Sequence, residues 1–86
     1  MSRIFTIYID DRQDVSESLL GLLCFIDYSS GQWVRDETNS ATVDDLVHAL
    51  TDIGYKWTVK MDYETPYESG IRHFTTLKEW SEWYEN

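Results

Sequence analysis

The sequence has little of what holds small secreted proteins together or joins several domains in one chain. Its 86 residues include one cysteine, one proline and four glycines. A single cysteine cannot form an internal disulfide, so this composition favours a reducing compartment. The chain shows no internal repeat and no linker rich in proline or glycine. We therefore expect one domain that spans residues 1–86.

Long hydrophobic runs are also missing. The most apolar stretch, residues 19–26, is eight residues long, whereas a helix needs about 20 apolar residues to cross a bilayer. The start of the chain holds one basic residue, and Thr6 interrupts its apolar stretch, which runs directly into Asp10 and Asp11. It does not have the pattern of a secretion signal. We therefore expect a cytoplasmic protein with no membrane segment.

Positive charge is the third feature that the chain lacks. Seven Lys and Arg residues stand against 16 Asp and Glu residues, which gives a formal net charge of −9. Direct nucleic-acid binding requires a basic surface that displaces counterions, so the charge argues against it. Aromatic residues make up 15% of the chain. This content argues against disorder, because acidic disordered chains are poor in aromatic residues.

The hydrophobic pattern predicts three strands directly. Residues 3–9 are apolar on both sides, which is typical of a strand in the middle of a sheet. Residues 55–63 alternate between apolar and polar side chains, so one face of this strand is expected to pack and the other to face water. Residues 71–75 form a further short strand after a turn with Pro66 and Gly70.

Two helices are predicted from their apolar faces and their first residues. Each begins with a capping box, in which a Thr side chain and an acidic side chain three residues later satisfy the free N–H groups of the first turn. Gly54 is suited to end the first of them. The two boxes are Thr42 with Asp45, before a helix at 43–53, and Thr76 with Glu79, before a helix at 77–85.

Residues 17–28 allow two interpretations. They form one helix, or a helix ends near residue 23 and residues 24–28 pair with 32–36 around the loop Ser29-Ser30-Gly31. Trp33 and Val34 favour a strand, and the loop suits a hairpin, so we prefer the second interpretation. The sequence therefore predicts an α+β fold, with two or three helices packed on a mostly antiparallel sheet of three to five strands.

No arrangement of residues has the spacing of a known catalytic or metal site. Lys60, Asp62 and Glu64 share one face of a predicted strand, as in metal-dependent nucleases, but Thr58 stands where such enzymes have an acid. A polar strand face explains the same residues. The remaining candidates, Cys24, His48 and His73, are isolated and lack the spacing of a zinc site. We expect a protein that is not an enzyme and that holds no metal or cofactor.

The distribution of charge is the most informative remaining feature. The predicted helix 43–53 exposes Asp44, Asp45, His48 and Asp52 but no Lys or Arg. Surface helices usually mix both signs, because oppositely charged pairs four residues apart each stabilise a helix by about 0.2–0.5 kcal/mol. Crowded like charges instead destabilise a small fold, so their presence suggests an external partner with a basic surface.

We therefore interpret the chain as a small acidic binding protein that presents carboxylates to a nucleic-acid-binding enzyme in place of phosphates. Tryptophan and tyrosine are enriched among the anchoring residues of interfaces, and this chain has four tryptophans and six tyrosines. The predicted partner-binding residues are carboxylates of the helix and of nearby loops: Asp36, Glu37, Asp44, Asp45, Asp52, Glu64 and Glu68.

In size and charge the chain resembles the small acidic anti-restriction and anti-CRISPR proteins of phages and mobile elements. The resemblance implies an inhibitor that mimics nucleic acid. It includes no shared motif, so it assigns no role to any residue. Two other interpretations fit the same composition: an immunity or antitoxin protein that blocks a basic nuclease toxin, or an assembly subunit that forms homodimers through residues 19–26.

Overall fold

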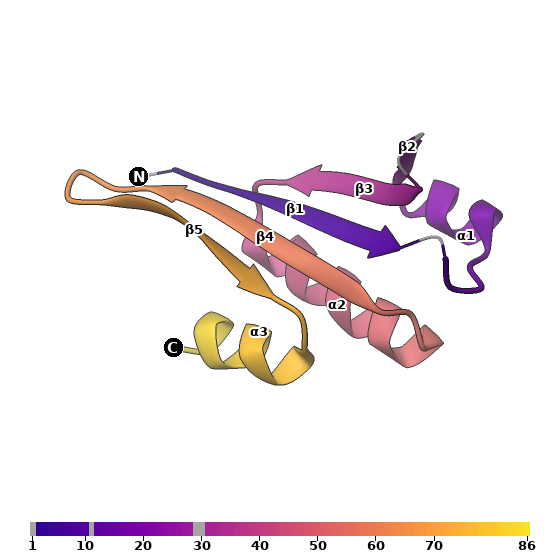
Figure 1. The fold of residues 1–86 in the computed structure, drawn as a ribbon. Coiled ribbons are helices and arrows are strands. Elements are labelled where there is room, and N and C mark those ends of the chain that lie inside the picture. Colours follow the sequence, from indigo (N-terminus) through magenta and orange to yellow (C-terminus); the bar gives the residue numbers. More distant parts are fainter. Residues whose placement is uncertain (1, 11, 29–30) are drawn as a thin grey trace.

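The computed structural model describes residues 2–10, 12–28 and 31–86, and within these ranges it confirms the α+β fold (Figure 1). One antiparallel sheet of five strands has the order β2-β3-β1-β4-β5, and three helices accompany it. The strands are β1 (Ser2–Asp10), β2 (Ile26–Tyr28), β3 (Gln32–Glu37), β4 (Trp57–Glu64) and β5 (Ser69–Phe74), and the helices are α1 (Glu17–Leu22), α2 (Ser40–Ile53) and α3 (Leu77–Tyr84).

Strand β1 lies in the middle of the sheet, between β3 and β4, as its two apolar sides predict. One side carries Phe5, Ile7 and Ile9, which are buried under the helices. We call this side of the sheet the covered face. The other side carries Ile4 and Tyr8, and we call it the open face. The alternation of side chains along β1 therefore divides the whole sheet into two different surfaces.

The segment after the first loop follows the second of the two interpretations. Helix α1 ends at Leu22, and β2 pairs with β3 in an antiparallel hairpin, whose loop residues Ser29 and Ser30 lie outside the described ranges. The chain turns between α1 and β2 at Cys24, whose φ of 62° is in the left-handed region. This turn brings both Leu20 and Phe25 into the core.

Helix α2 begins at Ser40, three residues earlier than predicted. The prediction that Thr42 and Asp45 form its capping box is therefore wrong. The actual N-cap is Asn39, whose side-chain oxygen accepts a hydrogen bond from the N–H of Ala41 at 2.9 Å. Asn is among the best N-cap residues, and here it precedes Thr42 along the chain. The predicted end is correct, because Gly54 adopts a left-handed φ of 95° at the C-cap.

Strand β4 begins at Trp57, two residues after the start of the alternating pattern. The preceding residues bind the loop that follows β1 instead. The N–H of Lys56 donates to the side-chain oxygen of Gln13 at 2.9 Å, and the hydroxyl of Tyr55 accepts from the N–H of Ser16 at 2.7 Å. These contacts explain why the periodic pattern extends further than the strand.

Helix α3 has the predicted capping box. The hydroxyl oxygen of Thr76 accepts from the N–H of Glu79 at 3.2 Å, and the Glu79 carboxylate accepts from the hydroxyl of Thr75 at 2.7 Å. Strand β5 ends at Phe74, directly before this cap, and not at residue 75 as predicted. The helix itself ends at Tyr84.

Helices α2 and α3 pack against each other and against the covered face (Figure 1). At the centre of this layer, the rings of Phe5 and Phe74 meet Trp80 edge to face, with centroids 5.8 and 5.4 Å away. Arg3 lies over Trp83 at 5.4 Å, so a cation closes one side of the aromatic cluster. Among the described residues, no helix is long and apolar enough to cross a lipid bilayer.

Candidate functional site

The seven predicted partner-binding carboxylates do not form one cluster. Asp44, Asp45 and Asp52 lie on α2, on the covered side of the sheet. Asp36 and Glu64 lie on the open face, because they are level with Thr6 and Ser2 of β1. The remaining two are Glu37, at the end of β3 and on the covered side, and Glu68, in the turn between β4 and β5.

A larger acidic surface arises where α2 and α3 lie side by side. Residues 40–53 and 77–85 carry six carboxylates and one basic residue, Lys78. We call this surface the acidic helical layer. The acidic side of residues 79–85 is visible in the sequence, whereas its place beside α2 follows from tertiary packing. The six carboxylates are Asp44, Asp45, Asp52, Glu79, Glu82 and Glu85.

Asp44 differs from its neighbours because it has a structural role within this layer. Its Oδ1 atom accepts a hydrogen bond from Nε1 of Trp80 at 2.8 Å and lies 3.4 Å from Nε2 of His48. Trp80 is fully buried, so its N–H group needs a partner inside the protein. Asp45, the next residue, is exposed. Of these two carboxylates, Asp45 is the one available to a partner.

Glu79 combines a capping role with exposure to solvent. Hydrogen bonds from the hydroxyl and N–H of Thr75, and from Thr76, lower the pKa of Glu79 below its ordinary value of 4.5. A carboxylate that accepts several hydrogen bonds is stabilised in its charged form. Glu79 therefore remains ionised at neutral pH and adds a firmly held negative charge to the layer.

Glu37 and Asp36 are held by contacts within the fold. The N–H groups of Asn39 and Thr38, with a smaller contribution from Arg35, lower the pKa of Glu37. The Thr6 hydroxyl donates to the Asp36 carboxylate at 2.9 Å. Glu37 thus supports the connection from β3 to α2, and Asp36 supports the pairing of β3 with β1.

Few of the carboxylates are neutralised by Lys or Arg. Among the described residues, such ion pairs join Asp10 to Arg12 and Glu37 to Arg35. The hydrogen bonds from Arg12 lower the pKa of Asp10 to about 2. Neither pair lies in the acidic helical layer, where Asp44 instead lies 3.4 Å from Nε2 of His48. The carboxylates of the layer therefore form no ion pair with a Lys or Arg of the described residues.

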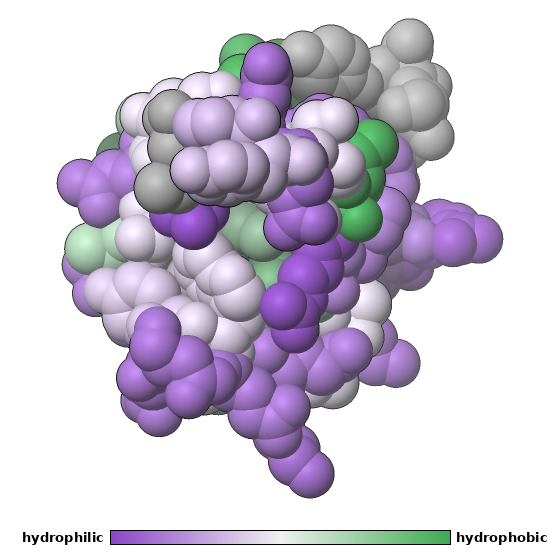
Figure 2. All heavy atoms as spheres, turned by 90° about the vertical axis from the view of Figure 1, so that its left-hand side faces the viewer, coloured by the Kyte–Doolittle hydropathy of each residue, from purple (hydrophilic) through white to green (hydrophobic). Residues whose placement is uncertain are grey.

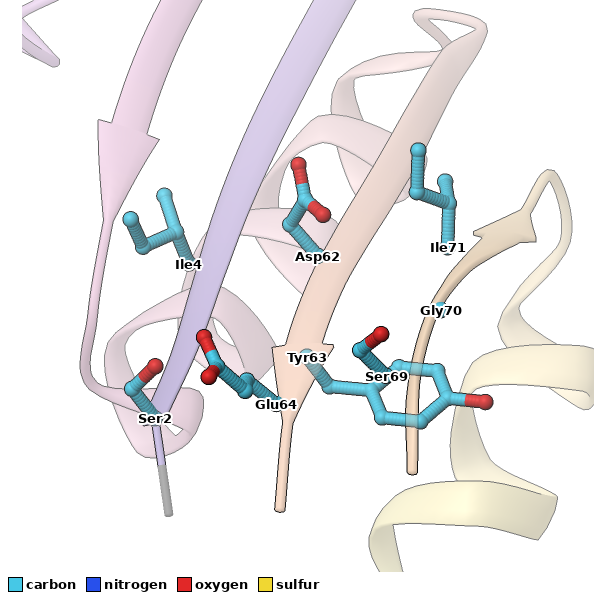
Figure 3. Close-up of a pocket in the computed structure, with 8 residues that line it drawn as sticks. All are labelled: Ser2, Ile4, Asp62, Tyr63, Glu64, Ser69, Gly70 and Ile71. Atoms are coloured by element: carbon cyan, nitrogen blue, oxygen red, sulfur yellow. The ribbon is translucent and has the colours of Figure 1, made fainter. Parts of the chain in front are cut away.

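The open face has a shallow hollow of about 420 Å³ near the turn between β4 and β5 (Figure 3). Asp62 and Glu64 of β4 line it together with Ile4 of β1 and Ile71 of β5. The hollow thus places Glu64 beside one other carboxylate and two apolar side chains, far from the carboxylates of α2. Figure 2 views this end of the molecule and shows a mostly hydrophilic surface with small apolar areas.

Of the other residues with reactive side chains, two are neighbours on the sheet and the third lies elsewhere. Lys60 and His73 are cross-strand neighbours on the open face, and Cys24 is exposed at the turn before β2. Across residues 2–10, 12–28 and 31–86, no three His, Cys, Asp or Glu side chains come together as the ligands of a metal ion would. The most distinctive chemical feature of the described chain is therefore its unneutralised charge.

Comparisons with known proteins found no match for this chain among protein-family models, curated proteins or solved structures.

Proposed function

We propose that this chain is a small acidic binding protein, with no catalytic activity of its own, that inhibits a nucleic-acid-binding enzyme. Its acidic helical layer would cover the basic surface that the enzyme uses for nucleic acid. The observation that supports the proposal is the charge of this layer: six carboxylates and one lysine in residues 40–53 and 77–85, with no ion pair to Lys or Arg among the described residues.

The geometry of α2 suits the replacement of phosphates. Asp45 and Asp52 are two helical turns apart, which separates them by about 10 Å along the axis. Three nucleotide steps of one B-DNA strand cover about the same distance, at roughly 3.4 Å each. Because the helix is packed on the sheet, the backbone positions that carry these carboxylates are fixed before a partner binds. Less conformational entropy is then lost on binding.

The energetic argument supports the same interpretation. A domain of this size has a total stability of about 4–13 kcal/mol, and repulsion between carboxylates reduces it. Asp44 and Glu79 stabilise the fold through their hydrogen bonds, whereas the excess of like charge in the layer would help only binding. Complementary charges raise association rates by about 10- to 1,000-fold at low ionic strength and disfavour wrong partners.

The closest alternative uses the same surface. An immunity or antitoxin protein that blocks a basic nuclease toxin would need the same unneutralised carboxylates, so the identity of the captured enzyme decides between the two. We further propose a cytoplasmic location and an origin in a phage or mobile element, since anti-restriction and anti-CRISPR inhibitors act on intracellular enzymes. The second alternative, an assembly subunit that forms homodimers through residues 19–26, predicts no basic partner.

The test is capture of nucleic-acid-binding proteins from host extract on the immobilised chain, with elution by a salt gradient. The variant Asp45→Lys/Asp52→Lys should lose the captured enzyme, because it reverses two exposed charges of the layer. Asp44 is left unchanged, since its carboxylate binds Trp80. The control, Asp27→Lys/Glu68→Lys, makes the same change in net charge at the β2 edge and in the β4–β5 turn.

Binding of the purified enzyme is then measured by fluorescence anisotropy, together with its competition against nucleic acid. We expect the affinity to fall at least about tenfold between roughly 50 and 200 mM salt, as is usual when exposed charges dominate binding. Equal loss of binding in the control variant would move the site away from the helices. An affinity that does not change with salt would contradict the electrostatic basis of the proposal.

A further inference from the structure

The open face of the sheet is left uncovered in the described chain. Helices α2 and α3 pack on the covered face, and the end of α1 is tied to the same side by Arg35, whose Nη1 donates to the carbonyl oxygen of Leu23 at 2.7 Å. Every large apolar side chain described as exposed within a strand lies on the open face. These are Ile4, Ile26 and Ile71, with 50%, 60% and 57% of their surface accessible.

The register of the strands arranges this face in rows. One row is mostly apolar and joins Ile26, Val34, Tyr8 and Thr58. The next row is polar and joins Asp36, Thr6, Lys60 and His73. The third row places Asp62 between two isoleucines and joins Ile4, Asp62 and Ile71 (Figure 3).

The polar row has an acid on one side of β1 and a base on the other. Asp36 of β3 and Lys60 of β4 are level with each other, because both pair with Thr6 of β1. Two copies can stack with their open faces together, related by a two-fold axis that is parallel to β1 and lies between the two sheets. This axis places the β3 side of one copy opposite the β4 side of the other. Asp36 of one copy then faces Lys60 of the other, twice in the same dimer. Such a match between a surface and itself is what a symmetric dimer requires.

The area of the face is close to the minimum for a specific interface. Its five strands hold 32 residues in all, and at about 4.8 Å between strands and about 3.3 Å per residue they give a footprint of roughly 500 Å². Two such footprints bury a total of about 1,000 Å², which is about the least expected of a biological interface. The isoleucine side chains of the outer rows would supply the apolar part of this area.

We propose that a second copy of this chain covers the open face, so that two sheets pack face to face in a symmetric dimer. The two acidic helical layers then lie on opposite outer sides of the dimer. This inference goes beyond the proposed function and does not depend on it, because it concerns the other side of the sheet.

The dependence of affinity on salt concentration distinguishes this inference from the proposed function. Each copy carries a net charge of −9, so repulsion opposes dimerisation and is weakened by added salt. The dimer should therefore become tighter as salt rises, whereas binding of a basic partner to the acidic helical layer should become weaker. The dimer is also measured with the chain alone, so failure of one proposal leaves the other unaffected.

The experiment is sedimentation equilibrium of the full chain from micromolar to sub-millimolar concentration, at low and moderate salt. We expect the mass to rise from 10.2 kDa towards twice that value. Ile4→Lys should weaken the dimer about 100-fold, because the change occurs twice in one interface. The control is Ile53→Lys on α2, whose original side chain is 43% exposed. It adds the same charge and should leave the dimer unchanged.

A charge exchange tests the arrangement of the two copies. Asp36→Lys and Lys60→Asp should each weaken the dimer, since each brings like charges together, and the double variant should restore it. Near-ultraviolet circular dichroism of the tryptophans checks that each variant is folded. A monomer under all conditions, or an Ile4→Lys dimer as tight as the original, would overturn the proposal. A double variant as weak as the single ones would overturn the arrangement along β1.

Discussion

On the covered face of the sheet the isoleucines of β1 are inaccessible to water, whereas Ile4 on the open face of the same strand keeps 50% of its surface exposed. Covered-face residues meet side chains from α2 and α3 and form one aromatic and aliphatic core. On the open face, Ile4, Ile26 and Ile71 keep at least half of their surface accessible. The same alternating sequence thus builds a surface that stabilises the monomer and another that is available for association.

The carboxylates differ between regions in a similar way. Several of them have a defined role inside the fold, such as Asp44 with Trp80 and Glu37 with the N–H groups before α2. Others, such as Asp45 and Asp52, make no hydrogen bond or ion pair through their side chains in the described chain. Net charge therefore does not reveal which carboxylates are available to a partner. The distinction depends on contacts between distant segments.

The largest expected effect compares two isoleucines of β1. Ile7→Ala should reduce the free energy of unfolding by about 2–5 kcal/mol, because it leaves a cavity in the core. Ile4→Ala should cost less than about 1 kcal/mol in the monomer, since its side chain is half exposed. Urea denaturation followed by tryptophan fluorescence at low protein concentration measures both values.

The stability costs of Ile4→Ala and Ile7→Ala should also depend differently on dimerisation. If a second copy covers the open face, the cost of Ile4→Ala should grow with protein concentration, because dimerisation stabilises the folded state by mass action. The cost of Ile7→Ala should stay constant. Equal costs for the two variants in dilute solution would mean that a segment of the same chain covers Ile4, and the distinction between the faces would be lost.

The second-largest expected effect on stability compares two adjacent carboxylates of α2, Asp44 and Asp45. Asp44→Ala leaves the buried N–H of Trp80 without its partner and should destabilise the fold by about 1–3 kcal/mol. Asp45→Ala should change stability by no more than about 0.5 kcal/mol. Asp44→Asn keeps an oxygen acceptor and should recover most of the loss. Thermal unfolding of the three variants is sufficient, and an Asp44→Ala protein as stable as Asp45→Ala would refute the role of the hydrogen bond.

The parts of the fold that follow from local patterns could be predicted from sequence. The apolar sides of β1 indicate a central strand, Gly54 ends α2, and the capping box of Thr76 and Glu79 opens α3. The start of α2 could not be predicted correctly, because Asn39 and Thr42 are both competent caps. Which of them caps the helix depends on where the chain leaves β3.

The candidate site was less accessible to prediction for the same reason. The excess of carboxylates is visible in the sequence, but Asp44 and Trp80 are 36 positions apart, so their hydrogen bond has no local signal. Asp36 and Lys60 both pair with Thr6, and this alignment likewise depends on the register of two different strands with β1. Such relations between distant segments follow from the register and the packing, and periodicity does not contain them.

The smallest expected effect concerns Glu79, where the capping contacts lower the pKa of an exposed carboxylate below 4.5. A lowered pKa means that the charged form is stabilised by folding. This contribution is present above the pKa of the unfolded chain and is lost as the pH falls through the lower pKa of the folded protein. Glu79→Gln should therefore be less stable than the original chain at neutral pH, and the difference should shrink as the pH falls below about 4.5.

Urea denaturation at neutral pH and at several acidic values measures this difference. Glu82→Gln is the matched control, because it removes the same charge from the next turn of α3 but none of the hydrogen bonds with Thr75 and Thr76. If both variants lose stability equally at neutral pH, net charge and not capping explains the effect. A loss in Glu79→Gln alone that disappears in acid would show that this carboxylate of the acidic helical layer, like Asp44, also stabilises the fold.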